Sequence, residues 1–141
     1  MDKTFGTKDP QLNYFDRAGA YLIDIKEGKL ACVRTPKGYF LLGGGIEAGE
    51  SHLDCIYREC LEEAGLAVTV TAPLCSADSY CIHHRIGPFH PIQYYYRGII
   101  GKQVQKPTEP NHTFVWLPLE EIETMYVPQQ IWAVQYAMKQ E

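Results

Sequence analysis

Three consecutive glycines open an acidic stretch, and residues 43–66 together read GGGIEAGESHLDCIYRECLEEAGL. The stretch contains one base, Arg58, and six acids: Glu47, Glu50, Asp54, Glu59, Glu62 and Glu63. Its local charge balance is therefore −5, whereas the whole chain carries a formal charge of −4. The remaining residues hold 11 acids and 12 bases and are close to neutral. This single window therefore accounts for the acidity of the protein.

The second half of the window has the pattern of an amphipathic helix over residues 52–64. Ser51 stands at the expected N-cap with Asp54 three residues later, which is a short form of the capping box. Gly65 stands where a C-terminal cap is expected. One apolar face follows helical spacing, through Leu53, Ile56, Tyr57, Cys60, Leu61 and Ala64.

Glu59, Glu62 and Glu63 are predicted to be neighbours on the opposite face of this helix. Like charges at these spacings destabilise a helix by about 0.2–0.5 kcal/mol per pair, and only Arg58 can offset them locally. One interpretation is a solvated acidic face. The other is a set of oxygen ligands for a hard cation such as Mg²⁺, which the adjoining glycine loop with its two further acids favours.

The rest of the chain is typical of one globular domain spanning residues 1–141. Hydrophobic residues make up 45% and charged residues 21%, which excludes disordered and fibrous classes. No apolar run approaches the roughly 20 residues needed to span a bilayer. The polar start, MDKTFGTKDPQ, is not a secretory signal. Five cysteines without a C-x-x-C pair indicate free thiols in a reducing cytoplasm.

Outside the window, short β-compatible runs alternate with helical segments. We expect strands at 17–25 and 29–34 joined by a hairpin turn at 26–28, and a short segment at 39–42 before the glycines. Further strands are expected at 66–82, 91–101 and 113–117, with a loop at 83–90, and helices at 119–125 and 129–139. This order predicts an α/β layered domain around a mixed sheet.

From Gly44 onward the residues resemble the Nudix box. The pattern is Gly, five residues, Glu, seven residues, then Arg-Glu-apolar-x-Glu-Glu-x-Gly-apolar, and it is matched by Gly44, Glu50, Arg58, Glu59, Glu62, Glu63, Gly65 and Leu66. Cys60 replaces the usual aliphatic residue, and Leu42 stands where many relatives carry Pro. The flanking segments are similar, more weakly, to the MutT-like branch of the family.

This resemblance implies a Nudix-type α/β/α sandwich and hydrolysis of a nucleoside diphosphate linked to another group, with Mg²⁺ or Mn²⁺. It makes Glu59, Glu62 and Glu63 the metal ligands. It makes Arg58 the residue that orients these glutamates. Gly44 and its neighbours would shape the loop around the site.

The general base stays open between two candidates. Glu50 would serve as a further metal ligand, direct or through water, or as the base. Glu109, which precedes the strand expected at 113–117, is the other candidate. A solvated loop acid is the simpler interpretation of Glu109.

Candidate substrate contacts are Gly44 and Gly45 in the loop, with four side chains further along: Tyr80, Arg85, Tyr94 and Tyr96. Aromatic rings can stack on a base, and Arg85 lies in a loop where it can meet phosphate. The competing interpretation is that the rings fill the core and that Arg85 is an ordinary surface residue.

The substrate itself is left open between a nucleoside triphosphate, a nucleotide sugar and a dinucleoside polyphosphate. The partner is a small nucleotide-like diphosphate, with no long nucleic acid and no membrane. A monomer and a homodimer both fit the sequence. The alternative function is a Nudix-fold sensor that binds a nucleotide without cleaving it, and the complete set of acids disfavours it.

Overall fold

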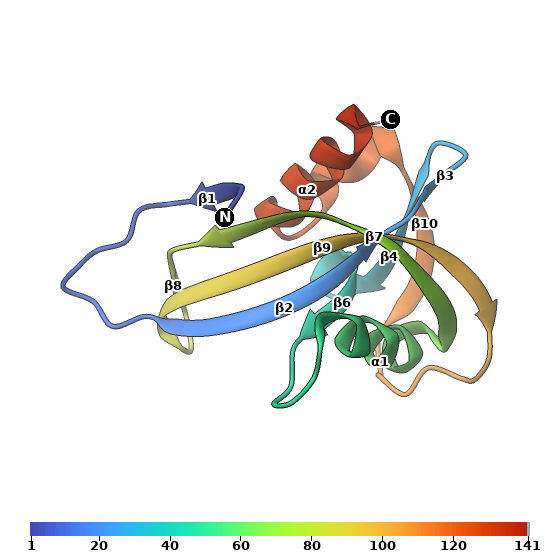
Figure 1. The fold of residues 1–141 in the computed structure, drawn as a ribbon, viewed down its shortest axis with the longest axis horizontal. Coiled ribbons are helices and arrows are strands. Elements are labelled where there is room, and N and C mark those ends of the chain that lie inside the picture. The colour runs from blue at the N-terminus through green and yellow to red at the C-terminus, as the bar shows by residue number, and fades with distance from the viewer. Residues whose placement is uncertain (141) are drawn as a thin grey trace.

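The computed structural model describes residues 1–140, in which a mixed sheet lies between two helices (Figure 1). The elements are β1 (Lys3–Phe5), β2 (Phe15–Ile23), β3 (Ile25–Lys26), β4 (Lys29–Thr35), β5 (Gly38–Phe40), β6 (Leu42–Gly45), α1 (His52–Ala64), β7 (Leu66–Ser79), β8 (Cys81–His83), β9 (Gly87–Gln103), β10 (Thr113–Pro118), the 3₁₀ helix η1 (Leu119–Thr124) and α2 (Pro128–Lys139).

The larger sheet has the order β1-β7-β9-β2-β6, with β8 paired to β9. The smaller sheet has the order β10-β4-β3, with β5 paired to β4. The larger sheet is mixed, because β1 runs parallel to β7 and β2 runs parallel to β9, while its other pairs are antiparallel. The smaller sheet is antiparallel throughout. The glycine strand β6 pairs with β2 at one end of the larger sheet, where it lies against α1.

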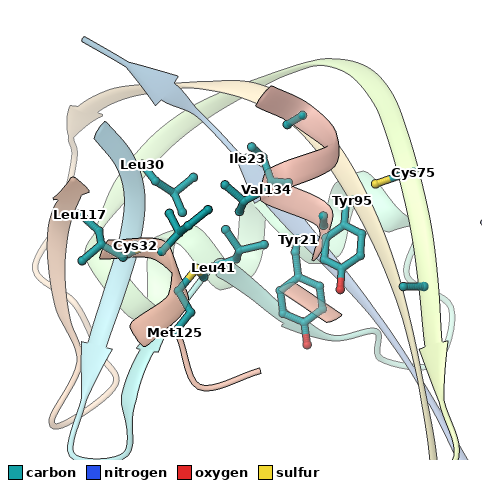
Figure 2. Close-up of a cluster of buried hydrophobic side chains, with 14 residues drawn as sticks. Tyr21, Ile23, Leu30, Cys32, Leu41, Cys75, Tyr95, Leu117, Met125 and Val134 are labelled. Carbon is teal, nitrogen blue, oxygen red and sulfur yellow. The ribbon is translucent and has the colours of Figure 1, made fainter. Parts of the chain in front are cut away.

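Strand β2 supplies side chains to both faces of the sheet. Ala20 and Leu22 belong to the core under α1, whereas Tyr21 and Ile23 belong to the core under α2. This alternation is the period of two that a strand buried on both sides requires. Figure 2 shows the core under α2, where Tyr21 and Tyr95 lie side by side with their hydroxyl groups pointing the same way. The predicted α/β/α arrangement is confirmed.

Several expected elements have other limits in the structure: the strand expected at 66–82 is divided into β7 and β8, the one expected at 91–101 is extended at both ends in β9, and β1 was not predicted. The strand expected at 17–25 ends at Ile23, because Asp24 is buried at the crossing between the sheets. Its carboxylate accepts from the Ile100 N–H at 2.8 Å, and its carbonyl accepts from the Ala31 N–H at 2.9 Å. The hairpin expected at 26–28 is confirmed, with positive φ at Glu27 and Gly28.

The loop expected at 83–90 is shorter in the structure, because β9 begins at Gly87 and pairs with β8 across a tight turn. Pro88 is tolerated there since it opposes the short edge strand β8. The helix expected at 119–125 is a 3₁₀ helix of six residues that begins without a side-chain cap. No helix within residues 1–140 has both the length and the apolar character needed to cross a membrane.

Candidate active site

Helix α1 begins at a complete capping box, which fixes the orientation of the acids that follow. The Ser51 hydroxyl accepts from the Asp54 N–H at 3.0 Å, and the Asp54 carboxylate accepts from the Ser51 N–H at 3.3 Å. Gly65 ends the helix with a φ of 66°, and its N–H donates to the Leu61 carbonyl at 2.9 Å. The predicted limits of this helix, 52–64, are confirmed.

Arg58 is the centre of a network of ion pairs on this helix. Its Nε and Nη2 donate to the two carboxylate oxygens of Glu50 at 2.6 and 3.0 Å. Its Nη1 donates to Glu59 at 2.7 Å and to Glu62 at 3.1 Å. Nη2 also donates to the Gly45 carbonyl at 3.0 Å, which ties the helix to the glycine loop. The bidentate bond to Arg58 lowers the pKa of Glu50 to about 2.

The glycine loop is shaped by contacts that exclude a side chain. Gly43 has a φ of 138°, and a Cβ there would lie 2.2 Å from the Ala20 carbonyl oxygen. A Cβ on Gly44 would lie 2.6 Å from the carboxyl carbon of Glu59, so this carboxylate rests directly on the loop backbone. The Gly43 N–H donates to Glu63 Oε1 at 2.9 Å. Glycine at these positions therefore brings both carboxylates against the loop.

The surroundings of Glu59 and Glu63 disfavour the charged form of their carboxyl groups. Burial raises the pKa of Glu63 well above its usual range, the Gly43 hydrogen bond opposes this, and nearby carboxylates raise it further. Burial likewise raises the pKa of Glu59, although Arg58 partly compensates. Glu109 contributes to the upward shift at both groups. The site thus holds more acid than its own bases can neutralise.

The segment before β10 reaches this site because it docks on the end of α1. The Thr108 and Glu109 N–H groups both donate to the Glu62 carbonyl at 2.9 Å. The Val104 N–H donates to the Gly65 carbonyl at 2.8 Å. These bonds satisfy carbonyl groups that a helix end leaves free. They also place Glu109 beside the acids of α1.

His112 lies at the end of the same segment. Its Nε2 is 4.0 Å from Glu63 Oε2, and its Nδ1 lies 2.9 Å from the Pro110 carbonyl, to which it can donate. The ring is half-buried, so it closes one side of the space in front of Glu63.

A cleft of about 540 Å³ opens in front of Glu63 and Gly43. A smaller cleft of about 250 Å³ adjoins it, and the two share Arg17, Tyr21, Gln93 and Val127. The Arg17 guanidinium lies flat on the loop, since a Cβ on Gly45 would be 2.6 Å from its Nη2. An exposed cation therefore stands at the junction of the clefts.

The donor set suits a hard divalent cation in its chemistry. Mg²⁺ prefers carboxylate oxygens together with water and phosphate oxygens, and buried acids with raised pKa values are stabilised by a positive ion. Within residues 1–140, however, no three His, Cys, Asp or Glu side chains are already arranged so that they could hold a metal ion. Glu50, Glu59 and Glu62 are each paired with Arg58 instead.

Comparison with known proteins then assigns the family, because a sequence profile of the NUDIX domain matches residues 14–138. The chain belongs to the Nudix family. As a Nudix hydrolase it is a pyrophosphohydrolase, so the predictions of family and of an enzyme are confirmed. No curated protein matches the chain by sequence.

Solved structures of Nudix proteins share the fold at low sequence identity. A NUDIX hydrolase from Nitrosomonas europaea has a TM-score of 0.70 and 15% identity, covering 89% of this chain and 90% of its own. A MutT NUDIX hydrolase from Burkholderia pseudomallei has a TM-score of 0.66 and 19% identity, covering 86% and 98%. The E. coli ORF135 protein has a TM-score of 0.61 and 20% identity, covering 89% and 91%. These likenesses establish the Nudix fold alone.

The structure gathers the Nudix box but not the four side chains predicted downstream of it. Tyr80 stacks on His90, with ring centroids 4.2 Å apart. Tyr94 packs on His52, and the Tyr96 hydroxyl lies 2.7 Å from His52 Nδ1. Arg85 is an exposed turn residue, and these four residues, Tyr80, Arg85, Tyr94 and Tyr96, line neither cleft.

Most residues that line the larger cleft were not predicted as site residues, among them Arg17, Gln93, His112 and Gln130. The alternation of side chains along a strand could have predicted one of them, Gln93. Gln93 shares the face of β9 that holds the buried Tyr95, opposite the face of Tyr94 and Tyr96. The position of His112 depends on loop docking, for which the sequence offers no comparable pattern.

Proposed function

We propose that this Nudix hydrolase cleaves a phosphoanhydride bond in a nucleoside diphosphate linked to another group, and that it requires Mg²⁺ or Mn²⁺. One observation carries the proposal. The buried Glu63 carboxylate, held by the glycine loop, borders a cleft of about 540 Å³ that also has cationic walls. Such a cleft can bring a phosphate chain and a cation together.

Glu59, Glu62 and Glu63 are the residues that would hold the cation. A divalent ion at these carboxylates would neutralise phosphate charge and lower the pKa of a bound water. The raised pKa values of Glu59 and Glu63 support this role, because a neighbouring cation relieves the strain that burial places on them.

The chain's own cations have separate tasks in this proposal. Arg58 is fully engaged with Glu50, Glu59 and Glu62, so it positions acids rather than substrate. Arg17 and Lys37 line the cleft from its walls and can contact the phosphates. Arg17 and Lys37 would therefore neutralise the negative charge of the substrate, because neither is paired with the acids around Arg58.

For the proton acceptor, the geometry favours Glu109 over Glu50. Both oxygens of Glu50 accept from Arg58, and a pKa of about 2 makes its carboxylate a weak base at neutral pH. Glu109 is anchored through its N–H to the Glu62 carbonyl and acts electrostatically on Glu59 and Glu63. Its carboxylate has no ion pair to an Arg or Lys within residues 1–140.

A substrate panel tests this function. Nucleoside triphosphates, nucleotide sugars and dinucleoside polyphosphates are each incubated with Mg²⁺, with Mn²⁺ and with EDTA, and phosphate products are measured. We expect at least one class to be cleaved only with the metal. Failure of every class would contradict the proposal and favour the sensor alternative.

A matched pair of variants separates the two functions. Glu63→Gln is expected to abolish metal-dependent hydrolysis while the protein stays folded, because the amide loses the charge that a cation needs. Glu120→Gln, an exposed acid on η1, is the control and should keep full activity. Wild-type turnover in Glu63→Gln would show that the metal ligands are assigned wrongly.

We place this activity in the cytoplasm, as a proposal supported by the cysteines. All five are free thiols, and four of them are buried. Free thiols are the usual state in a reducing compartment. Whether the enzyme acts as a monomer or as a homodimer is measured directly by size-exclusion chromatography with light scattering.

A further inference from the structure

Two buried glutamine amides face the larger cleft from different elements. Gln93 comes from β9 and is 7% exposed, and Gln130 comes from α2 and is 1% exposed. Buried polar side chains are normally hydrogen-bonded within the protein. Within residues 1–140 no fully buried side-chain nitrogen or oxygen lacks a partner, so an amide group of these two residues that has no protein partner reaches the surface of the cleft.

The orientation of Gln130 is fixed by a backbone donor. The Leu41 N–H donates to Gln130 Oε1 at 2.8 Å, and an N–H can only donate. The amide nitrogen must therefore point the other way, with its two hydrogens available. Within residues 1–140 no group accepts from it.

The Tyr95 hydroxyl orients the Gln93 amide. The Tyr95 hydroxyl, on a side chain that is 1% exposed, donates to Gln93 Oε1 at 2.6 Å. That separation is usual for O–H···O bonds and short for N–H···O bonds, so the oxygen faces Tyr95. The nitrogen is then directed toward the Tyr21 hydroxyl, which at 3.5 Å is a weak acceptor.

Both amides therefore present N–H donors to the cleft, and donors on a largely enclosed surface favour a ligand that brings acceptors. Phe40, Leu41 and Val127 line the same cleft and suit a flat ring, whereas Arg17 and Lys37 already serve the phosphates. Resting on the proposed function, we infer that this cleft selects a nucleobase with an exocyclic oxygen, such as hypoxanthine or uracil, over its amino counterpart, adenine or cytosine. Tyr95 acts as a positioning residue, because it holds the Gln93 amide in the donor orientation.

Nucleoside monophosphates test the inference without turnover, since they contain no phosphoanhydride bond. IMP carries an oxo group at position 6 of its base where AMP carries an amino group, and UMP and CMP differ in the same way at position 4. In each pair the adjacent ring nitrogen is protonated only in the oxo member. Isothermal titration calorimetry in Mg²⁺ is expected to give an affinity about tenfold higher for the oxo member of each pair, because an amino group would face the amide donors with another donor instead of an acceptor. Equal affinity within both pairs, or no binding by any of the four, would overturn the inference.

Variants of Tyr95 and Gln93 test the orientation itself. Tyr95→Phe is expected to bring the IMP to AMP ratio to within about twofold, because the amide can then turn over. Tyr94→Phe, the adjacent ring on the other face of the sheet, is the control and should keep the wild-type ratio. Gln93→Glu keeps an acceptor for Tyr95 and offers an acceptor to the ligand, so the ratio should fall below one. Its added charge repels all four phosphates and cancels in the ratio.

The outcomes separate this inference from the proposed function. Preference for IMP without hydrolysis of any diphosphate substrate would refute the proposed function alone. Hydrolysis with equal affinity for IMP and AMP would refute the base selection alone. An unchanged ratio in a folded Tyr95→Phe protein would refute the positioning role.

Discussion

Replacing Glu63 by Gln should stabilise the metal-free protein while destroying its activity. The side chain is 7% exposed, and its Oε1 accepts from the Gly43 N–H at 2.9 Å. Gln keeps this acceptor and the shape of the side chain but removes the buried charge. The variant therefore isolates the electrostatic cost of the carboxylate.

The sign of the effect follows from the raised pKa of Glu63. Between the ordinary value of 4.5 and the raised value, the native state binds more proton than the unfolded state. The wild-type free energy of unfolding therefore falls as pH rises through this window, by at most about 1.4 kcal/mol per pH unit. Gln has no proton to exchange, so its advantage should be near zero at pH 4 and should grow as pH rises toward 7.5. Leaving a buried polar group uncompensated typically costs about 1–3 kcal/mol, which sets the scale of the expected gain. That gain corresponds to about 3–9 °C in Tm.

Urea unfolding of both proteins in EDTA at pH 4, 6 and 7.5 measures this difference. Glu62→Gln is the control, because its side chain is 34% exposed and pairs with Arg58, so its removal should bring no gain. Mg²⁺ should reverse the order by stabilising the wild type alone. A Glu63→Gln protein that is less stable than the wild type in EDTA at pH 7.5 would refute the idea that this carboxylate is strained.

Three further predictions use the geometry of the loop and the helix. Arg58→Lys should lower kcat by about 10–100-fold with the fold retained, because Lys cannot make the bidentate bond; turnover and circular dichroism measure this. Gly43→Ala should lower the free energy of unfolding in urea by about 3 kcal/mol or more, because the new Cβ would overlap the Ala20 carbonyl oxygen. Gly49→Ala should lower it by about 1 kcal/mol, because there only the positive φ opposes a side chain. Similar losses in the two variants would show that the overlap at Gly43 is not important. Gly45→Ala should displace the Arg17 guanidinium and raise KM about tenfold with little change in Tm, and an unchanged KM would remove Arg17 from the phosphate site.

The part of the site that the sequence predicted is the part encoded in one continuous segment. The cap at Ser51, the acids of α1 and the stop at Gly65 follow from helical spacing, and the structure confirms their limits. The same spacing put Arg58 within reach of Glu62, as observed at 3.1 Å. Local periodicity was sufficient because every partner lies within one or two helical turns.

The walls of the clefts were not predictable in this way, because they depend on contacts between distant segments. His112 reaches Glu63 only because the preceding segment docks on the end of α1. Gln130 reaches the cleft because α2 packs across the sheet and bonds to Leu41. The tyrosines of β9 were misleading for a different reason. Strand alternation separates Tyr95 from Tyr94 and Tyr96, but the sequence does not say what each face of β9 packs against. In the structure none of the three lines either cleft.

The acids of the Nudix box divide into two groups with different electrostatic states. Glu50 and Glu62 are paired with Arg58, and the pairing makes Glu50 an unusually strong acid. Within residues 1–140 the Glu63 carboxylate accepts from the Gly43 N–H and lies 4.0 Å from the His112 ring. Burial disfavours its charged form. A protein selected for stability alone would replace it by a neutral residue, since an uncompensated buried carboxylate destabilises the fold. Its retention is understandable if a cation supplies the missing charge during function, so the strain at Glu63 is itself an argument for the metal.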